Sequence, residues 1–333
     1  MTSPGASGPS PGPWHRVPAY GDSTDVRVRG DVLPGIVVAA VAAIGICIDW
    51  RVFVDTWAGQ RVEYATLKGA RYGQNKLWHV AEPVLNVVSV SFIAAVLLAA
   101  VLIAVLRRRW MLAVQVAVLM TGANLTTRIL KLVIVDRPDL GVAGPRMNTL
   151  PSGHTTAAAS IAAVLVLVVP PRARPWAAVL GAVYTAATGV STLVGQWHRP
   201  SDVVAAVLVV TAWGGLTSAI VARHPGGSGR ASRSARGHGA PATAELALGS
   251  TVHAMSSRVR LAALFLVVVG LGAAVPASLA LRRSWHAVGQ LDTRAELLTA
   301  YAGGAFGVLA ASFLGFAVLL VVRHLATARV GSA

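Results

Sequence analysis

The sequence predicts an all-α fold: a polytopic membrane helical bundle with a six-span core and two extra C-terminal transmembrane helices. Hydrophobic residues make up 55% of the 333 residues and charged residues only 13%, whereas soluble domains carry roughly 25% charged residues. Eight apolar runs are long enough to cross a bilayer core of about 30 Å, which takes roughly 20 residues. Many of the arginines and lysines lie between these runs, where a membrane protein meets lipid headgroups.

The predicted spans are the uncharged runs themselves. In chain order they cover residues 32–48, 83–106, 110–127, 155–171, 176–197, 203–222, 261–281 and 297–322. The third run can continue through Arg128 and Lys131 to Val135, which carries two cations toward an aqueous boundary. Trp110 and Trp197 stand at the ends of runs, as expected for indole rings at the headgroup level.

The short connectors predict the orientation. Those at 107–109 and 171–175 contain arginine and no acid, which is typical of the cytoplasmic side and places both termini there. The predicted segments are a disordered cytoplasmic tail (1–31), a six-span membrane domain (32–222, motif core 83–222), a basic flexible cytoplasmic linker (223–260), a two-span membrane segment (261–322) and a cytoplasmic tail (323–333). The linker holds six arginines and one acid, Glu245, so it suits contact with anionic lipid heads.

The formal net charge of +16 does not indicate a nucleic-acid partner, because the cations follow no continuous polar face. The expected partners are the lipid bilayer and a membrane lipid, while the oligomeric state stays open. The single cysteine, Cys47, lies inside the first apolar run and has no disulfide partner. The first 30 residues lack the apolar core of a signal peptide, so the first run is expected to be an uncleaved anchor.

Two connectors on the predicted outer face, 128–154 and 198–202, are unusually polar. Proline disfavours helical geometry in the preceding residue, so the helix that carries Lys131 is expected to end near Arg137 and Pro138. Both cations are thereby delivered to the membrane surface. With the orientation above, the two connectors face the same side of the membrane.

The segment Pro-Ser-Gly-His at 151–154 opens the fourth predicted span. Free backbone N–H groups and the positive end of the helix dipole at a helix start suit a bound phosphate. Gly153 lets the backbone approach an anion closely, and Ser152 can donate a hydrogen bond. His154 stands beside this turn as a potential general acid.

The segment that opens the sixth span places His198 and Asp202 four residues apart, on one face of a helical turn. An aspartate bonded to one imidazole nitrogen fixes the tautomer and leaves the other nitrogen free to attack phosphorus. His198 is therefore the candidate nucleophile.

Together these residues resemble the type 2 phosphatidic acid phosphatase superfamily, which includes membrane lipid phosphatases and vanadium-dependent haloperoxidases. Its pattern is Lys-x6-Arg-Pro, then Pro-Ser-Gly-His, then Ser-Arg-x5-His-x3-Asp. The second motif is intact at 151–154, and the third keeps His198 and Asp202. The resemblance covers roughly residues 83–222, and the last two spans have no part in it.

The match departs from the family pattern at two positions. Lys131 precedes Arg137 by six positions instead of seven, which on an ideal helix turns it by about 100° from the expected face. Thr192 stands where the family has an arginine, so the fork that arginine offers to phosphate oxygens is missing. The additional candidates that could supply positive charge are Arg128, Arg146 and Arg199.

The resemblance implies a metal-independent lipid phosphatase without a cofactor. His198 attacks phosphorus, Asp202 orients it, and His154 protonates the leaving oxygen. The implied phosphate-binding groups are Lys131, Arg137, Ser152 and Gly153. An isoprenoid diphosphate such as undecaprenyl diphosphate, a phosphatidate or a phosphatidylglycerol phosphate suits a site at the outer boundary. Phosphotransfer through the same phosphohistidine and non-catalytic binding of lipid phosphates stay open as alternatives.

Overall fold

The computed structural model describes residues 32–87, 98, 102, 110–144, 147–223 and 256–327. Within these ranges all regular structure is helical, which confirms the predicted all-α class. The helices are α1 (Leu33–Asp49), α2 (Trp57–Val87), α4 (Trp110–Ile129), α5 (Gly153–Val168), α6 (Arg174–Val194), α7 (Pro200–Arg223), α9 (Ser257–His286) and α10 (Arg294–Thr327). Three short turns complete them: the π-helical η1 (Trp50–Val54) and η2 (Leu130–Ile134), and the 3₁₀ turn η3 (Val288–Gln290).

Six of the described helical segments are long and apolar enough to cross a membrane. They are Leu33–Val54, Trp110–Ile134, Arg174–Val194, Pro200–Arg223, Ser257–His286 and Arg294–Thr327. Each coincides with a predicted apolar run, and the third run continues through Lys131 as expected. Helix α5 is shorter but also apolar. The chain is an integral membrane protein.

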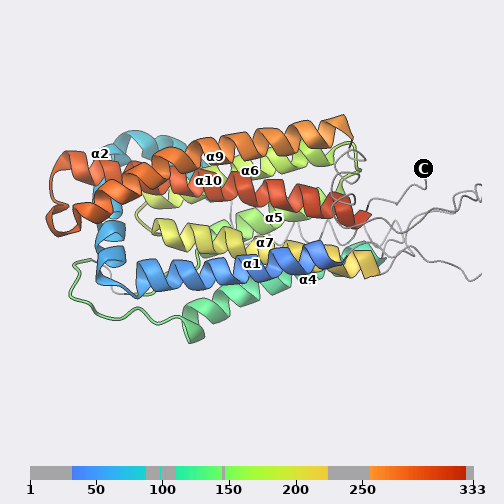
Figure 1. Cartoon of the computed structure of the whole chain (residues 1–333), viewed down its shortest axis with the longest axis horizontal. Coiled ribbons are helices and arrows are strands. Elements are labelled where there is room, and N and C mark those ends of the chain that lie inside the picture. Colours follow the sequence, from blue (N-terminus) through green and yellow to red (C-terminus); the bar gives the residue numbers. More distant parts are fainter. Residues whose placement is uncertain are drawn as a thin grey trace, which may run out of the picture.

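The polar helix α2 is the main feature of the fold that the apolar runs did not predict. Its residues 57–82 precede the predicted span 83–106, most of which lies outside the described residues. Helix α2 packs against α6 and α10. It begins at the end of the bundle where α1 ends, and that end also holds the connectors that join α6 to α7 and α9 to α10 (Figure 1).

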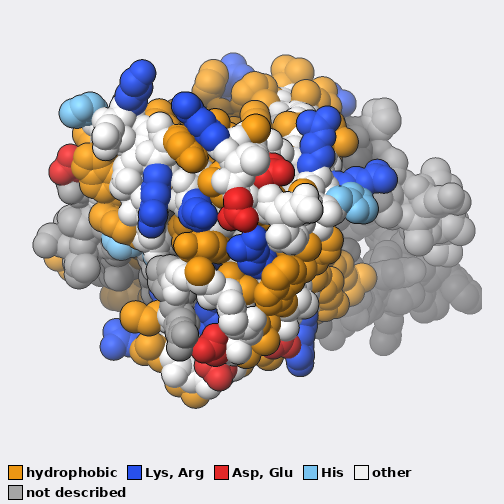
Figure 2. Space-filling model, turned by 90° about the vertical axis from the view of Figure 1, so that its left-hand side faces the viewer, with side chains coloured by type: hydrophobic (Ala, Val, Ile, Leu, Met, Phe, Trp, Pro, Cys, Tyr) orange, Lys and Arg blue, Asp and Glu red, His pale blue; other side chains and the backbone are white. Residues whose placement is uncertain are grey.

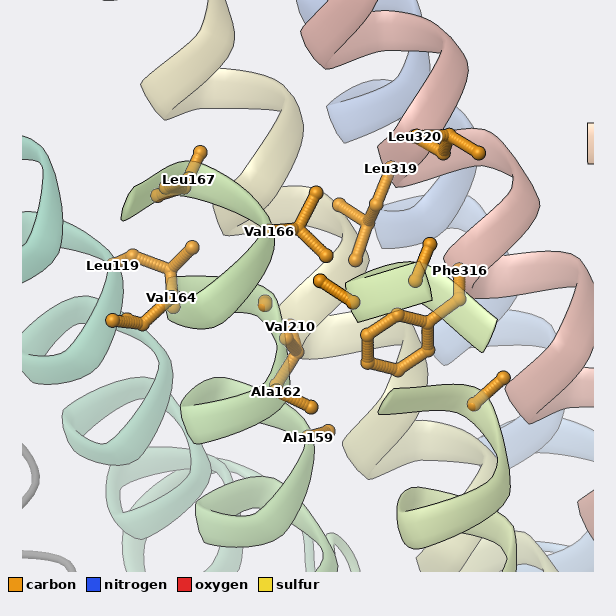
Figure 3. Close-up of a cluster of buried hydrophobic side chains, with 14 of the residues drawn as sticks. Leu119, Ala159, Ala162, Val164, Val166, Leu167, Val210, Phe316, Leu319 and Leu320 are labelled. Carbon is orange, nitrogen blue, oxygen red and sulfur yellow. The ribbon is translucent and has the colours of Figure 1, made fainter. Parts of the chain in front are cut away.

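The core lies where α5 passes between its neighbours. Five alanines of α5 are buried: Ala157, Ala158, Ala159, Ala162 and Ala163. Small side chains let helices approach closely, which is the main source of helix packing inside a bilayer. Figure 3 shows part of this core, with Val164 of α5 beside Leu119 of α4, and with Val210 of α7 and the ring of Phe316 from α10 on the other side of α5.

The two C-terminal helices belong to this core and are not a separate appendage. Helix α10 packs along α9 and also against α7, α2 and α6. Phe316 is 1% exposed and lies against Gly181 of α6, where an added Cβ would meet the Phe316 ring at 2.6 Å. The linker after α7 therefore separates these helices from the first six predicted spans in sequence but not in space.

Candidate active site

The connector between α6 and α7 carries the candidate nucleophile. Gln196 adopts a positive φ of 58°, which turns the chain sharply after α6. The backbone N–H groups of Trp197 and His198 then donate to the carbonyl oxygen of Thr192, at 3.0 and 3.4 Å. Pro200 opens α7, a position that suits its fixed φ. These constraints hold His198 directly before the first turn of α7.

His198 and Asp202 form the pair that the sequence predicts. His198 Nδ1 lies 3.2 Å from Asp202 Oδ2, and the two residues are 8% and 1% exposed. The same carboxylate oxygen accepts from the backbone N–H of Arg199 at 2.8 Å and from Thr149 Oγ1 at 2.6 Å. A carboxylate that accepts from Nδ1–H leaves Nε2 of His198 as the nitrogen with a free lone pair.

The start of α5 lies beside this pair. Ser152 is the N-cap residue, and its Oγ accepts from the Thr155 N–H at 3.3 Å. The Ser152 backbone N–H donates to the Asp202 carbonyl oxygen at 2.7 Å, which links the second motif to the third through the main chain. A Cβ added to Gly153 would meet no atom within 4 Å. Open space therefore lies beside the backbone at the predicted phosphate-binding turn.

His154, in this turn, lies near the candidate nucleophile His198. Its ring centre lies 6.2 Å from that of His198 and 5.5 Å from that of Trp197. Trp197 is half-exposed, so it can lie at the headgroup level and still form one wall beside His154.

Lys131 lies near the same group of residues. Its ammonium is close enough to act electrostatically on both Asp202 and His154. The predicted rotation of about 100° assumed an ideal α-helix, but η2 is a π-helical turn in which Val135 N–H donates to Leu130 O at 2.9 Å. The one-residue difference in spacing therefore does not turn Lys131 away from the site. Arg128, at the end of α4, has an exposed side chain.

Asn148 fixes the loop that joins these elements. Its side-chain amide donates to the carbonyl oxygens of Lys131 at 3.0 Å and Val135 at 2.8 Å. Its Oδ1 accepts from the Leu150 N–H at 3.1 Å. One side chain thus joins the end of η2 to the residue before the Pro-Ser-Gly-His turn.

A second cluster, the Glu63 cluster, lies next to Asp202 and consists of Glu63, Arg137, Arg199 and Ser201. Arg137 lies 3.3 Å and Arg199 3.9 Å from Glu63 Oε2, and the Ser201 hydroxyl donates to Glu63 Oε1. Burial raises the pKa of the Glu63 carboxyl to about 7, and Asp202 acts in the same direction. The two arginines and the Ser201 hydroxyl oppose this shift.

Arg199 makes further contacts that fix its guanidinium. Its NH1 donates to Thr149 Oγ1 at 2.9 Å and to the Met147 carbonyl oxygen at 3.4 Å. Because Thr149 donates in turn to Asp202, Arg199 connects the Glu63 cluster to the His198–Asp202 pair. Arg137 and Arg199 also line a cavity of about 20 Å³, which has room for about one water molecule and not for a phosphate.

The sequence-predicted residues thus fall into two groups. His198, Asp202, His154, Gly153 and Lys131 lie close together at the end of the bundle, and the fully buried Ser152 caps α5 beside them. Arg137 and Arg199 are paired with Glu63, and Arg146 lies outside the described residues. Thr192 is fully buried and its hydroxyl donates to Gly189 O at 2.7 Å.

Sequence reasoning missed Glu63, Asn148 and Thr149. Glu63 lies in α2, a region without a motif, and its role follows only from tertiary contacts.

Figure 2 looks onto the end of the molecule that holds the candidate site, where Lys and Arg side chains are spread among hydrophobic ones. A paired histidine and aspartate, a second histidine and a helix start are groups that can bind and process phosphate.

A comparison with models of known protein families finds one match. Residues 112–225 match the family model described as the PAP2 superfamily. This segment is therefore similar to the superfamily that the motif resemblance predicted, and members of the superfamily are generally phosphatases. No curated protein and no solved structure matches the chain.

Proposed function

We propose that this chain is a metal-independent membrane phosphatase that hydrolyses lipid phosphate or isoprenoid diphosphate monoesters through a phosphohistidine intermediate. The observation that carries the proposal is the geometry of three side chains. Asp202 holds Nδ1 of His198 at 3.2 Å, and the His154 ring lies 6.2 Å from the His198 ring across the start of α5. A nucleophile and a candidate general acid thus face one space that borders open backbone at Gly153.

In the first step, Nε2 of His198 attacks phosphorus and the phosphorus–oxygen bond to the leaving group breaks. His154 gives its proton to that oxygen, and Asp202 stabilises the imidazolium that forms at His198. In the second step, water gives up a proton to His154 and attacks the phosphohistidine. Phosphate leaves, and both histidines return to their starting states.

The negative charge on the equatorial oxygens needs fixed donors. The Gly153 N–H, the Ser152 hydroxyl and the Lys131 ammonium lie around the space at the start of α5 and are the candidates for this role. Arg137 adds positive charge from the Glu63 cluster, where its pairing with Glu63 reduces its availability. Its contribution to the transition state is therefore expected to be smaller than that of Lys131.

The site is proposed to face the extracytoplasmic side, with both termini in the cytoplasm. The argument is the arginine-bearing connector 171–175, which lies at the far end of α6 from His198 and is typical of a cytoplasmic loop. In a Cys47→Ser background, a cysteine at Gly289 should react with an impermeant maleimide on intact cells. A cysteine at Arg172 should react only after permeabilisation. The reverse labelling pattern would show that the site faces the cytoplasm.

The central test is a panel of lipid phosphates in mixed micelles, assayed for release of inorganic phosphate by wild type and His198→Ala. Wild type should release phosphate from at least one member, and the variant should lose at least about a thousandfold in rate. EDTA should leave the rate unchanged. Equal release by both proteins would sink the assignment of His198. Recovery of the phosphate in a second lipid would favour the phosphotransferase alternative.

Non-catalytic binding of lipid phosphates is the second candidate, and Thr192 and the Glu63 cluster favour it. The family arginine is missing at Thr192, and Arg137 and Arg199 are paired with an acid. Binding of lipid phosphates without phosphate release from any member of the panel would support this reading. Binding would then depend on Lys131 and be unchanged in His198→Ala.

A further inference from the structure

A cavity of about 300 Å³ lies between the two C-terminal helices and the catalytic part of the bundle. Most of its wall consists of small or apolar residues of α9 and α10, and α1, η1, α2 and α7 contribute the rest. The lining includes Ser201, next to Asp202, but neither His198 nor His154. This volume is at the lower end of the range for small-molecule sites, roughly 300–1,000 Å³. The cavity is therefore large enough for a ligand and separate from the phosphate-binding turn.

Two polar atoms in the cavity lining have no hydrogen-bond partner among the described residues. They are Oδ2 of Asp49, at the end of α1, and Oγ of Ser284, near the end of α9. Asp49 is 8% exposed and Ser284 is 2% exposed. Buried polar groups without partners are costly, and most find a partner in the protein, in water or in a ligand. Because both residues line the cavity, a molecule inside it is the candidate partner for these two atoms.

The other polar groups of the lining have partners. The Ser201 hydroxyl donates to Glu63, and Glu63 is also paired with Arg137. The Thr66 hydroxyl donates to backbone oxygens of Val62 and Ala300. The chemistry left for a ligand is one carboxyl group, one serine hydroxyl and a long apolar wall.

We propose that this cavity binds a long-chain lipid alcohol, with its hydroxyl between Asp49 and Ser284 and its chain along α9 and α10. The alcohol O–H can donate to Asp49 Oδ2, and its oxygen can accept from the Ser284 hydroxyl. A phosphate monoester is a poor occupant, because no Lys or Arg stands among the described residues that line the cavity. Hydrolysis of a lipid phosphate monoester releases such an alcohol, and this link alone rests on the proposed function.

The test is photolabelling of the full chain in lipid nanodiscs with a long-chain primary alcohol that carries a diazirine in its chain. Labelled peptides should come from α9 and α10 around the cavity. Unlabelled alcohol should compete at least about tenfold better than an alkane of equal length or the corresponding alkyl phosphate. Equal competition by the alkane would show partition into lipid and overturn the proposal.

Gly307 and Gly272 provide a matched pair of variants. An added Cβ meets no atom within 4 Å at either position, but only Gly307 lines the cavity. Gly307→Leu should reduce labelling about tenfold by filling the space, and Gly272→Leu should label like wild type. Asp49→Leu and Ser284→Ala should weaken competition by the alcohol but not by the alkane. Unchanged labelling in Gly307→Leu would contradict the site.

Labelling of His198→Ala separates the alcohol site from catalysis. His198→Ala leaves the cavity lining intact, so it should be labelled like wild type even when it releases no phosphate. Wild type could be labelled specifically and yet release no phosphate from any lipid phosphate. That result would support the alcohol site and overturn the proposed function. Activity without specific labelling would do the reverse.

Discussion

The two sides of the candidate site differ in how their charges are held. On the side of His198 and His154, the polar groups surround open space at Gly153, and Lys131 acts on them electrostatically. On the side of the Glu63 cluster, two arginines are buried against one acid around a cavity with room for about one water. The first side is arranged to receive an anion, while the second already contains one. The difference indicates that arginine content alone does not locate the phosphate.

The largest expected effect comes from breaking the His198–Asp202 pair, which is proposed to be catalytic. Asp202→Asn keeps the size of the side chain but favours the wrong tautomer of His198, and it weakens the contacts with Thr149 and Arg199. The turnover number for phosphate release should fall by about a thousandfold or more. Asp292→Asn, at an exposed position in the connector that joins α9 to α10, serves as the control. A fall of less than tenfold in Asp202→Asn would remove the orienting role of this residue.

Replacing one cation on each side compares how much the two sides contribute to phosphate release. Lys131→Gln should lower kcat/KM about a hundredfold, because it removes a charge that acts on the catalytic groups. Arg137→Gln should lower it less than about tenfold, because Glu63 already neutralises that charge. Steady-state kinetics on the best lipid of the panel measures both. The opposite order would place the phosphate at the Glu63 cluster.

Thr149→Val tests the link between the sides. The substitution removes the hydrogen bond to Asp202 at 2.6 Å and a partner of Arg199 at 2.9 Å, with little change in volume. The turnover number should fall about tenfold, with a smaller change in KM, since a hydrogen bond to a charged group contributes roughly 1.5–3 kcal/mol. Thr299→Val, on an exposed face of α10, should change neither. A pure KM effect would assign Thr149 to substrate binding.

The last prediction concerns stability and pH, not turnover. The pKa of Glu63 in the folded protein, about 7, lies above its ordinary value of 4.5. A raised carboxyl pKa stabilises the fold below the ordinary value, and this contribution is lost as the pH rises through about 7. Relative to Glu63→Gln, wild type should lose up to about 3 kcal/mol of unfolding free energy between about pH 5 and pH 8.

Unfolding temperatures of the two proteins across this pH range measure the change. Glu82→Gln, at an exposed position of the same helix, should keep a constant difference from wild type. A constant difference for Glu63→Gln as well would mean that Glu63 does not titrate in this range.

The membrane helices could be predicted because the feature that defines them can be recognised within a short stretch of sequence. An apolar run of sufficient length is enough to identify α1, α6, α7, α9 and α10. Helix α2 escaped prediction because its polar sequence satisfies no such requirement, and its position depends on α6 and α10. The apolar run of α10 predicts a membrane helix, but it does not show which helices α10 packs against. The sequence therefore could not reveal that α10 belongs to the core.

The same distinction holds in the candidate site. His198 and Asp202 lie within one helical turn, so their spacing alone predicts their contact. Lys131 depends on a π-helical turn, which the ideal geometry used for the prediction does not include. Glu63 is 74 residues from Arg137 in the chain, and no local pattern indicates their pairing. The proposed roles of Arg128, Arg146 and Arg199 stay predictions, and Arg146 lies outside the described residues.

The main-chain bond from Ser152 N–H to Asp202 O has a practical consequence for finding the natural lipid. No side-chain substitution removes this bond, except one to proline at position 152. Variants disabled at His198 should therefore keep the start of α5 and the start of α7 in register, and with them the space for the headgroup. Such a variant, extracted from native membranes, should retain its lipid through purification, and mass spectrometry of the organic extract would identify it.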